Sequence, residues 1–382
     1  MKVRASLCTG INEPWTTHEI DIDEPRAKEV QVRMVYAGMC HSDEHLRTGD
    51  MSADPFTLEL LGANSMFPCV GGHEGAGIIE AVGPGVTSVA VGDHIATSFI
   101  PSCGTCFWCA SGRGHLCDLG ITTLVGPMIS DGTYRHHLNG MVLNRMTQLG
   151  TFAERMVVNE ASVIKIDPEV NLKAAALISC GVSTGFGSVV DRAQTRPGEV
   201  VVIIGAGGVG SGAIYGARFA GAQAIVVIDP LEFKRDHALS LGATHAVAST
   251  LDAHFLVSEL TRGRMADVVV LTPGVMTGDL VKPSCAMASK DGRIVLTGLG
   301  KFDDEAVTAS LYNITVFNQT LMGSIFGSTS PRVQIPRLLS LHEAGKLDVE
   351  RLISAEYALD DIQRGYDDLA AGKNIRGIVT FI

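Results

Sequence analysis

The chain of 382 residues has few aromatic residues and no excess of basic ones. Aromatic side chains make up 5% of it, and 30 Lys and Arg stand against 41 Asp and Glu, which gives a formal net charge of −11. Recognition of nucleic-acid phosphates needs a basic face, so this balance argues against a nucleic-acid partner. Scarce aromatics together with 43 glycines suit an α/β protein with many tight turns.

The sequence also lacks the long apolar runs of membrane and secreted proteins. A membrane helix needs ~20 apolar residues in succession, and no uninterrupted run approaches that length. The first residues, MKVRASLCTG, do not contain the apolar stretch of roughly 7–15 residues found in signal peptides. We therefore expect no membrane partner and a cytoplasmic location.

Two regions of the chain differ in the pattern of their apolar residues. Residues 29 to 100 contain short runs rich in Val and Ile, broken by Gly and Pro, which are typical of an irregular β domain. From residue 195 onward, strand cores such as VVVII and AIVVI alternate with segments of helix length. This alternation indicates βαβ units around a parallel sheet. The predicted fold is α/β, with a doubly wound parallel sheet and a separate, mostly-β domain.

A glycine loop, GAGGVG at residues 205–210, follows the apolar run VVVII and precedes a helix-like segment. Gly205 permits the turn, Gly207 lets the backbone approach a pyrophosphate, and Gly210 lets the helix pack closely on the strand. Unpaired N–H groups at the helix N-terminus would hold the phosphate. This context predicts a dinucleotide site.

The next strand, AIVVID, ends in Asp229, 19 residues after Gly210. A carboxylate at this place accepts the hydroxyls of an adenosine ribose and repels a 2′-phosphate. Asp229 therefore favours NAD over NADP.

Four of the nine cysteines, Cys103, Cys106, Cys109 and Cys117, follow the pattern C-x2-C-x2-C-x7-C. Four thiolates at short loop spacings suit a closed tetrahedral zinc site, which has no position left for a water. The competing iron–sulfur pattern has a last gap of about three residues and a proline after the fourth cysteine. Here Asp118 follows Cys117, so the spacing favours structural zinc.

A second metal site is suggested by three scattered motifs. Cys40 lies in GMCHSDEH, His73 in GGHEGAG and Cys180 in SCGVSTG. A catalytic zinc needs three protein ligands and one open position. Spacing alone does not show that these three residues meet at one site. A role for Cys180 as a small buried hydrophobe stays open at this point.

Together these motifs resemble the zinc-dependent alcohol dehydrogenases of the medium-chain dehydrogenase/reductase superfamily over nearly the whole chain. The matching stretches also include SCGVSTGFGSVV and GKNIRGIV. The resemblance implies a GroES-like catalytic domain with two zinc sites, at residues 1–181 and 326–382, and a Rossmann NAD-binding domain at residues 182–325. It further implies an alcohol or aldehyde substrate and a homodimer or homotetramer.

The resemblance also assigns roles to individual residues. Zinc ligands are implied at two sites, the catalytic Cys40, His73 and Cys180 and the structural Cys103, Cys106, Cys109 and Cys117. Ser42 and His45 match the proton relay, and Asp43 and Glu74 the acidic residues around the zinc. Contacts with NAD are implied for His41, Thr184, Gly205, Gly207, Gly208, Val209, Gly210, Asp229, Lys234 and Arg376. Phe99 and Leu149 match positions in the substrate pocket and suggest an apolar alcohol.

Several other polar residues have no role in this pattern. Cys8, Cys69 and Cys285 are expected to be small buried hydrophobes. His136 and His137 form a pair on a polar stretch and are expected at the surface, and Glu44 is expected to be a solvated loop charge.

The chain departs from the pattern at two places. His41 stands where many relatives have arginine, which weakens a phosphate contact. Residues 50–66, DMSADPFTLELLGANSM, lengthen the segment between Cys40 and His73 and could form a lid, an oligomer contact or a surface loop.

The stretches GMCHSDEHLRTGD and TSFIPSCGTCFWC also resemble those of an actinobacterial subgroup, the nicotinoproteins, whose nicotinamide stays bound through turnover. These enzymes regenerate it with an artificial nitroso acceptor or an external redox carrier. Two other functions stay open. A glutathione-dependent formaldehyde dehydrogenase needs a basic anion pocket that the sequence does not reveal. A non-catalytic nucleotide sensor has no need of an open zinc site such as Cys40, His73 and Cys180 would form.

Overall fold

The computed structural model describes residues 1–122, 124–302, 304 and 306–381. The chain forms two compact units. Unit 1 comprises Met1–Cys180 and Ser330–Ile382, and unit 2 comprises Gly181–Thr329.

Unit 2 is built on a six-stranded sheet in which every neighbouring pair is parallel. Its strands, in spatial order, are β14 (His245–Val247), β13 (Ala224–Ile228), β12 (Val200–Ile204), β15 (Ala266–Leu271), β16 (Ala288–Leu296) and β17 (Thr320–Gly323). Counted along the unit, this is the order 3-2-1-4-5-6 of doubly wound dinucleotide-binding folds. All residues of β12 and β13 are buried, as expected for Val- and Ile-rich strands covered on both faces. The predicted fold class is confirmed.

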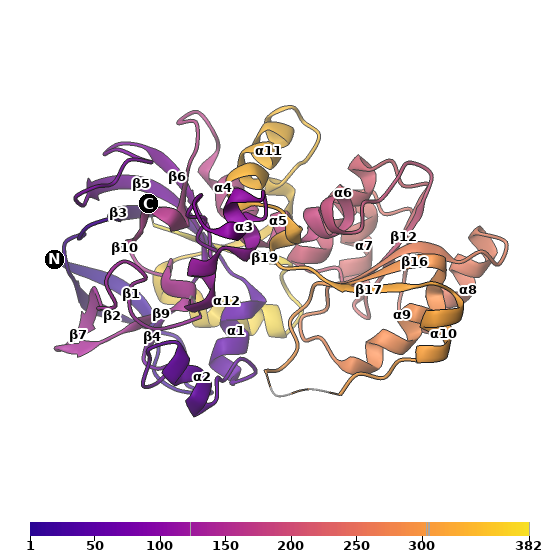
Figure 1. Ribbon diagram of the computed structural model, residues 1–382, viewed down its shortest axis with the longest axis horizontal. Coiled ribbons are helices and arrows are strands. Elements are labelled where there is room, and N and C mark those ends of the chain that lie inside the picture. Colours follow the sequence, from indigo (N-terminus) through magenta and orange to yellow (C-terminus); the bar gives the residue numbers. More distant parts are fainter. Residues whose placement is uncertain (123, 303, 305, 382) are drawn as a thin grey trace. The chain divides into compact units, whose positions relative to one another are not determined.

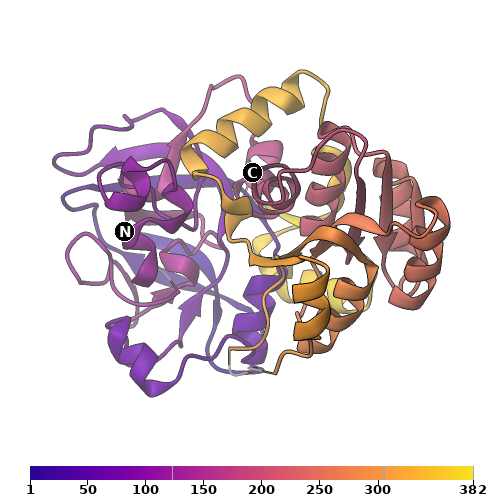
Figure 2. The same ribbon diagram turned by 45° about the vertical axis from the view of Figure 1, so that its right-hand side comes forward.

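Helices connect and cover the strands of unit 2 (Figure 1). They are α5 (Ser183–Gly187), α6 (Gly208–Phe219), α7 (Glu232–Leu241), α8 (Thr250–Leu260), α9 (Val281–Met287) and α10 (Leu311–Val316). Helix α6 contacts α7, and α8 contacts α9. Figure 2 turns this unit toward the viewer and shows its helices around the sheet.

Unit 1 contains two sheets. The first has the order β8 (Met141–Val142), β7 (His136–Leu138), β2 (Thr16–Ile22), β1 (Lys2–Cys8), β4 (Cys69–Val70) and β9 (Asn144–Arg145). The second has the order β11 (Val163–Lys165), β6 (His94–Thr97), β5 (Glu74–Val82), β3 (Glu29–Gly38), β19 (Arg376–Thr380) and β18 (Ile353–Tyr357), and β10 (Arg155–Asn159) also pairs with β3. Strand β19 therefore pairs directly with β3, although more than 330 residues separate them.

The helices of unit 1 are mostly short. They are α1 (His41–Thr48), α2 (Pro55–Leu60), α3 (Phe107–Ala110), α4 (Leu172–Leu177), α11 (Pro331–Glu343) and α12 (Ile362–Ala370). Single 3-10 turns complete the two units at Gly114–Leu116, Asp118–Thr122, Met146–Gln148, Glu160–Ser162, Gly278–Leu280, Phe326–Ser328, Glu350–Leu352 and Leu359–Asp361.

One continuous helical stretch, Leu172–Arg192, is long and apolar enough to cross a membrane by composition. It is interrupted by the π-helical turn Ile178–Val182 and ends in a second one, Ser188–Arg192. Of its apolar window 89% is buried inside the protein, as in the core helix of a globular fold.

The extra segment at 50–66 contains helix α2, whose first N–H groups are capped by the Asp54 carboxylate. One side of the segment is anchored, because Leu58 and Met66 pack in the apolar cluster beneath α1 and α12. The other side presents Phe56 and Leu60 to solvent. The lid, oligomer-contact and surface-loop interpretations all remain predictions.

Candidate functional site

The motif GMCHSDEH joins strand β3 to helix α1. Cys40 has an extended backbone and immediately precedes the helix, which begins at His41. The carbonyl oxygen of Cys40 accepts a hydrogen bond of 3.3 Å from the hydroxyl of Tyr366 on α12. A helical turn places His41 beside His45, with 5.0 Å between the ring centroids. The polar residues of this motif are thus held in order by a helix.

Four potential metal ligands converge in unit 1. One donor atom each from Cys40, His73, Glu74 and Cys180 lie within 4.8 Å of one another, and all four residues are buried. They come from three places in the fold: the start of α1, the junction of β4 and β5, and the π-helical turn Ile178–Val182. Such turns are frequent at functional sites because they displace a side chain from the regular helical pattern.

Gly72 allows the turn that presents His73. Its φ of 87° lies in the left-handed region, and a Cβ there would come within 2.3 Å of the Thr151 hydroxyl. The N–H of Gly72 donates a 2.8 Å hydrogen bond to Oδ1 of Asp43. Oδ2 of the same carboxylate lies 3.1 Å from Nδ1 of His73. Asp43 therefore fixes both the turn and the imidazole, and leaves Nε2 of His73 for a metal.

The charges of this cluster depend on one another. A hydrogen bond between the two thiols lowers the pKa of Cys40 well below its ordinary value and raises that of Cys180. Burial lowers the pKa of His73, but Asp43 and Cys40 outweigh it and raise that pKa well above its usual value. Two sulfurs and one imidazole, gathered at a buried place, form a donor set that suits zinc.

Glu74 lies next to these ligands and pairs with Arg376 at the start of β19. Burial raises the pKa of Glu74 to about 7, although the Arg376 guanidinium opposes this shift. Both side chains are almost fully buried. In this structure the guanidinium thus neutralises an acid beside the metal ligands, and the pyrophosphate contact predicted for Arg376 remains a prediction.

The two residues assigned to the relay, Ser42 and His45, both belong to helix α1. Oγ of Ser42 lies 3.7 Å from Sγ of Cys40. His45 is buried, and its Nδ1 lies 3.2 Å from Oδ2 of Asp50. Sequence reasoning did not single out Asp50. The available signal was the pair Gly49–Asp50 directly after the helix, because a glycine at that place turns the chain back.

The two predicted substrate-pocket residues share one apolar cluster, in which Leu149 is buried and against which Phe99 packs. The ring of Phe99 meets the His73 imidazole edge to face, with centroids 5.8 Å apart. Leu149 is completely buried in an apolar cluster of β3, β5 and β10. Phe99 thus lies beside the ligand cluster, and both pocket roles remain predictions.

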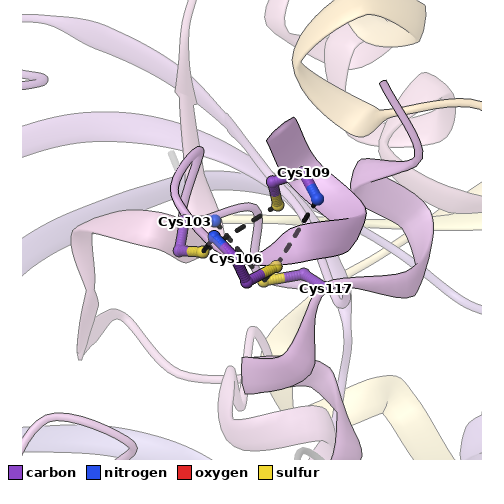
Figure 3. Close-up of side chains that lie close together, drawn as sticks. All are labelled: Cys103, Cys106, Cys109 and Cys117. Atoms are coloured by element: carbon purple, nitrogen blue, oxygen red, sulfur yellow. Dashed lines mark hydrogen bonds between the residues drawn. The ribbon is translucent and has the colours of Figure 1, made fainter. Parts of the chain in front are cut away.

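The four-cysteine lobe forms a second donor cluster, shown in Figure 3. The Sγ atoms of Cys103 and Cys109 are 3.9 Å apart, and so are those of Cys106 and Cys117. A tetrahedron with Zn–S bonds of ~2.3 Å has edges of ~3.8 Å, so the cavity between the sulfurs has the size of a zinc ion.

Backbone N–H groups point at these sulfurs. Cys106 and Thr105 donate to Sγ of Cys103, and Cys109 donates to Sγ of Cys106. Burial raises the pKa of Cys103, but the hydrogen bonds outweigh it and lower that pKa to about 6. Burial raises the pKa of Cys117 to about 12. The hydrogen bonds at Cys103 thus favour its thiolate, which is the form that binds a metal.

The glycine loop in unit 2 has the geometry expected from its sequence. Gly205 has a φ of 96°, and a Cβ on Gly210 would come within 1.9 Å of the Gly205 oxygen. A Cβ on Gly207, in contrast, would meet nothing within 4 Å. The loop ends at α6, which begins at Gly208 and is 12 residues long, and its Val209 lies in the first turn. The open space at Gly207 beside a helix N-terminus fits a pyrophosphate.

Asp229 lies at the end of β13 and holds the loop. Its carboxylate accepts hydrogen bonds from the N–H groups of Ala206, at 2.9 Å, and Leu231, at 3.0 Å. The residue is buried. Its negative charge is therefore fixed beside the open side of the loop, where a ribose would be recognised.

The other residues assigned to the coenzyme lie on helices. Thr184 is a buried residue of α5, and its hydroxyl has no hydrogen-bond partner among the described residues. Lys234 lies half-buried on α7, and the neighbouring Arg235 donates hydrogen bonds to the carbonyl oxygens of Asp229 and Pro230. His41 belongs to unit 1, as Arg376 does.

Two expectations about surface residues are wrong. His136 is completely buried, because its strand β7 forms part of the first sheet of unit 1, and burial lowers its pKa well below the ordinary value. Glu44 lies on helix α1 rather than in a loop and forms an ion pair with Arg47. Cys8, Cys69 and Cys285 are buried free thiols, as expected.

Comparison with known proteins identifies the family. Residues 26–168 match the family model described as "Alcohol dehydrogenase GroES-like domain", and residues 208–343 match that of "Zinc-binding dehydrogenase". The chain belongs to the zinc-dependent alcohol dehydrogenases. Zinc and NAD are the cofactors of such an enzyme, and both donor clusters and the glycine loop fit them.

Curated relatives of this alcohol dehydrogenase match along its whole length. Alcohol dehydrogenase B of Mycobacterium tuberculosis is 44% identical over 381 residues, which cover 100% of this chain and 99% of the relative. The NDMA-dependent alcohol dehydrogenase of Amycolatopsis methanolica is 43% identical over 379 residues, 99% of each chain. The S-(hydroxymethyl)glutathione dehydrogenase of a Synechocystis strain is only 32% identical.

Solved structures agree with this assignment. Benzyl alcohol dehydrogenase from Acinetobacter calcoaceticus superposes with a TM-score of 0.89 at 26% identity, and the match covers 100% of both chains. The findings thus favour an alcohol dehydrogenase over the formaldehyde dehydrogenase and the non-catalytic sensor.

Proposed function

We propose that this alcohol dehydrogenase oxidises small, mainly apolar alcohols at the cluster of Cys40, His73 and Cys180, with an NAD that stays bound through turnover. The single observation that carries the site is the convergence of two thiols and an imidazole within 4.8 Å in a buried part of unit 1. The sulfurs and the imidazole would hold zinc, a Lewis acid that lowers the pKa of an oxygen ligand.

The surrounding residues would perform three tasks. Asp43 orients His73 through the 3.1 Å contact at Nδ1. Ser42, beside Cys40, takes the proton of the alcohol, and His45 receives it further along α1. Phe99, next to His73, would contact the apolar part of the substrate. The four cysteines of the lobe at 103–117 would hold a second, structural zinc, since all four positions of a tetrahedron are filled.

The coenzyme would bind on unit 2. The N–H groups at the start of α6 face the open space at Gly207, and the fixed charge of Asp229 would accept ribose hydroxyls and exclude a 2′-phosphate. Bound NAD supplies the carbon that takes the hydride. Thr184 and Lys234 are the further contacts on unit 2 that we propose, and the pyrophosphate contacts implied for His41 and Arg376 remain predictions.

Retention of NAD is supported by the 43% identity with an NDMA-dependent alcohol dehydrogenase. It requires only slow dissociation: nanomolar affinity with an association rate of ~10⁶ M⁻¹s⁻¹ gives an off-rate of ~10⁻³ s⁻¹. Such an enzyme would pass its electrons to an external redox carrier. His41 stands where many relatives have arginine. This replacement opposes the retention of NAD, because it weakens the contact with the pyrophosphate.

The test uses the protein as purified. We expect about two zinc ions per chain and, after desalting, a reduced-nicotinamide absorbance band when an alcohol is added without NAD. Absence of the band, with full activity on added NAD, would overturn retention and leave an ordinary dissociable enzyme. One zinc per chain, with no activity under either condition, would overturn the catalytic site itself.

We also propose that the protein is a homo-oligomer in the cytoplasm. Strand β17 lies at the edge of its sheet, and near it Leu311, Tyr312 and Val316 of α10 are exposed. Exposed apolar side chains beside an open strand edge are typical of a subunit contact. All nine cysteines are free, as expected in a reducing compartment.

A further inference from the structure

The chain turns back on itself directly after helix α1. The helix ends at Thr48, and Gly49 has a φ of 84°, which reverses the chain. The N–H of Met51 then donates a 3.2 Å hydrogen bond to the carbonyl oxygen of His45. As a result Asp50, five residues after His45, lies beside the imidazole ring.

The contact between the two side chains is direct. Oδ2 of Asp50 lies 3.2 Å from Nδ1 of His45, and the hydroxyl of Thr48 lies 3.0 Å from the same oxygen. The His45 side chain is 2% exposed and the Asp50 side chain 16%. The ring of His41 also lies near that of His45, with 5.0 Å between the centroids. The imidazole is therefore held in a buried place by a carboxylate that the helix end fixes.

We propose that Asp50 is the positioning residue of the proton relay. A carboxylate accepts hydrogen bonds only, so it keeps the proton of the imidazole on Nδ1. Nε2 then carries the lone pair and is the atom that takes up the relayed proton. The resulting imidazolium is paired with Asp50 and afterwards gives one proton to water, which restores the neutral ring. A buried carboxylate that orients a histidine acts in this manner in catalytic triads.

This inference rests on the proposed relay role of His45, but its first consequence is independent of catalysis. Without Asp50 the imidazole is free to take the other tautomer. Nitrogen NMR of protein labelled with ¹⁵N-histidine distinguishes the two tautomers, and the His45→Gln variant identifies the signal of His45. We expect the Nδ1–H form in the unmodified protein and a large shift toward Nε2–H in Asp50→Asn, because the new amide can donate to Nδ1.

The second consequence is kinetic. We expect Asp50→Asn to lower kcat for alcohol oxidation about tenfold with little change in KM, a smaller loss than the ~10²–10⁴-fold of direct general acid–base catalysis. Asp50→Glu, which keeps the carboxylate, should recover most of the rate. Asp54→Asn is the matched control, because Asp54 is an exposed carboxylate of the same segment whose hydrogen bonds are with Phe56 and Thr57 at the start of α2. It should leave both the tautomer and kcat unchanged.

The possible outcomes distinguish the positioning role of Asp50 from the relay role of His45. If Asp50→Asn folds with unchanged zinc content, and both the His45 tautomer and kcat are unaltered, the positioning role is overturned. If His45→Gln keeps full activity, the relay role of His45 fails, whatever the tautomer shows. A tautomer change in Asp50→Asn without any change in kcat, when His45→Gln is slow, would also overturn the kinetic part of the proposal.

Discussion

At the scale of single residues, the charge of a few buried side chains decides the chemistry. Asp43, Glu74 and Asp229 are each buried and each has a defined partner: an imidazole, a guanidinium and two backbone N–H groups. A buried carboxylate needs such partners, because burial without them strongly disfavours the charged form. Each of the three therefore fixes the position of the group that it contacts.

Asp229 provides a test of coenzyme choice. We expect the unmodified protein to prefer NAD to NADP, and Asp229→Asn to narrow the preference by about tenfold, or ~1.4 kcal/mol, because it removes the repulsion of a 2′-phosphate. The amide oxygen keeps one acceptor for the Ala206 N–H. Titration of coenzyme-free protein with both nucleotides measures the effect. Equal affinity for the two in the unmodified protein would remove the ribose role of Asp229.

Residue types and spacing predicted the cluster of Cys103, Cys106, Cys109 and Cys117, because its four ligands lie close together in the sequence. The set of Cys40, His73 and Cys180, with Asp43 beside it, was implied only by the family resemblance, since its members lie far apart in the chain. The contact of His45 with Asp50 depends on the left-handed φ of Gly49, and the pairing of Glu74 with Arg376 depends on strand β19 lying beside β3. Such contacts come from tertiary structure, which local pattern does not contain.

At the scale of elements, short irregular pieces present the ligands. The lobe at 103–117 contains only α3, of four residues, and a 3-10 turn, Gly114–Leu116. An isolated helix of this length is not stable in water. Metal binding must therefore supply part of the folding free energy of the lobe.

We expect Cys106→Ser to remove the zinc of this lobe and to lower the melting temperature, since a closed site loses one of its four thiolates. Metal analysis should give one zinc per chain instead of two, and the melting temperature should fall by roughly 2–3 °C, as for a loss of about 2 kcal/mol in a chain of this size. Cys285→Ser is a suitable control, because Cys285 is a buried cysteine outside both clusters. Unchanged zinc content and stability in Cys106→Ser would contradict the assignment.

Some of the helices and strands could be predicted from the sequence, and others could not. The Val- and Ile-rich strands of unit 2 were recognisable, because strands buried on both faces consist almost entirely of apolar residues. Helix α1 was not foreseen, since its eight residues, HSDEHLRT, include only one apolar side chain and give no helical periodicity. His136 was misplaced for a related reason: a three-residue strand is too short to show which side faces the core.

At the scale of the whole molecule, we infer a contact between subunits at the exposed edge of the parallel sheet in unit 2. Strand β17 ends the sheet, and Leu311 of α10 is 78% exposed. The unpaired N–H and C=O groups of an edge strand with apolar neighbours can pair with other chains, unless another element or a subunit covers that edge.

We therefore expect the protein to be a homo-oligomer by light scattering after gel filtration. Leu311→Asp should weaken the assembly and raise the monomer fraction, because it places a charge in a contact that excludes water. Leu251→Asp is the matched control: Leu251 is 63% exposed on α8 of the same unit. A monomeric unmodified protein, or equal effects of the two substitutions, would exclude this edge as the contact.

The pairing of β19 with β3 also orders events during synthesis on the ribosome. The second sheet of unit 1 has β19 between β3 and β18, so it cannot close until residues 376–380 have been made. Unit 2 consists of one continuous segment, Gly181–Thr329, and is complete earlier. Domains generally fold in the order in which they are synthesised. Here the nucleotide-binding half should fold while the half with both proposed metal sites still waits for strand β19, which leaves the six thiols and one imidazole of those sites exposed to the cell until residues 376–380 have been made.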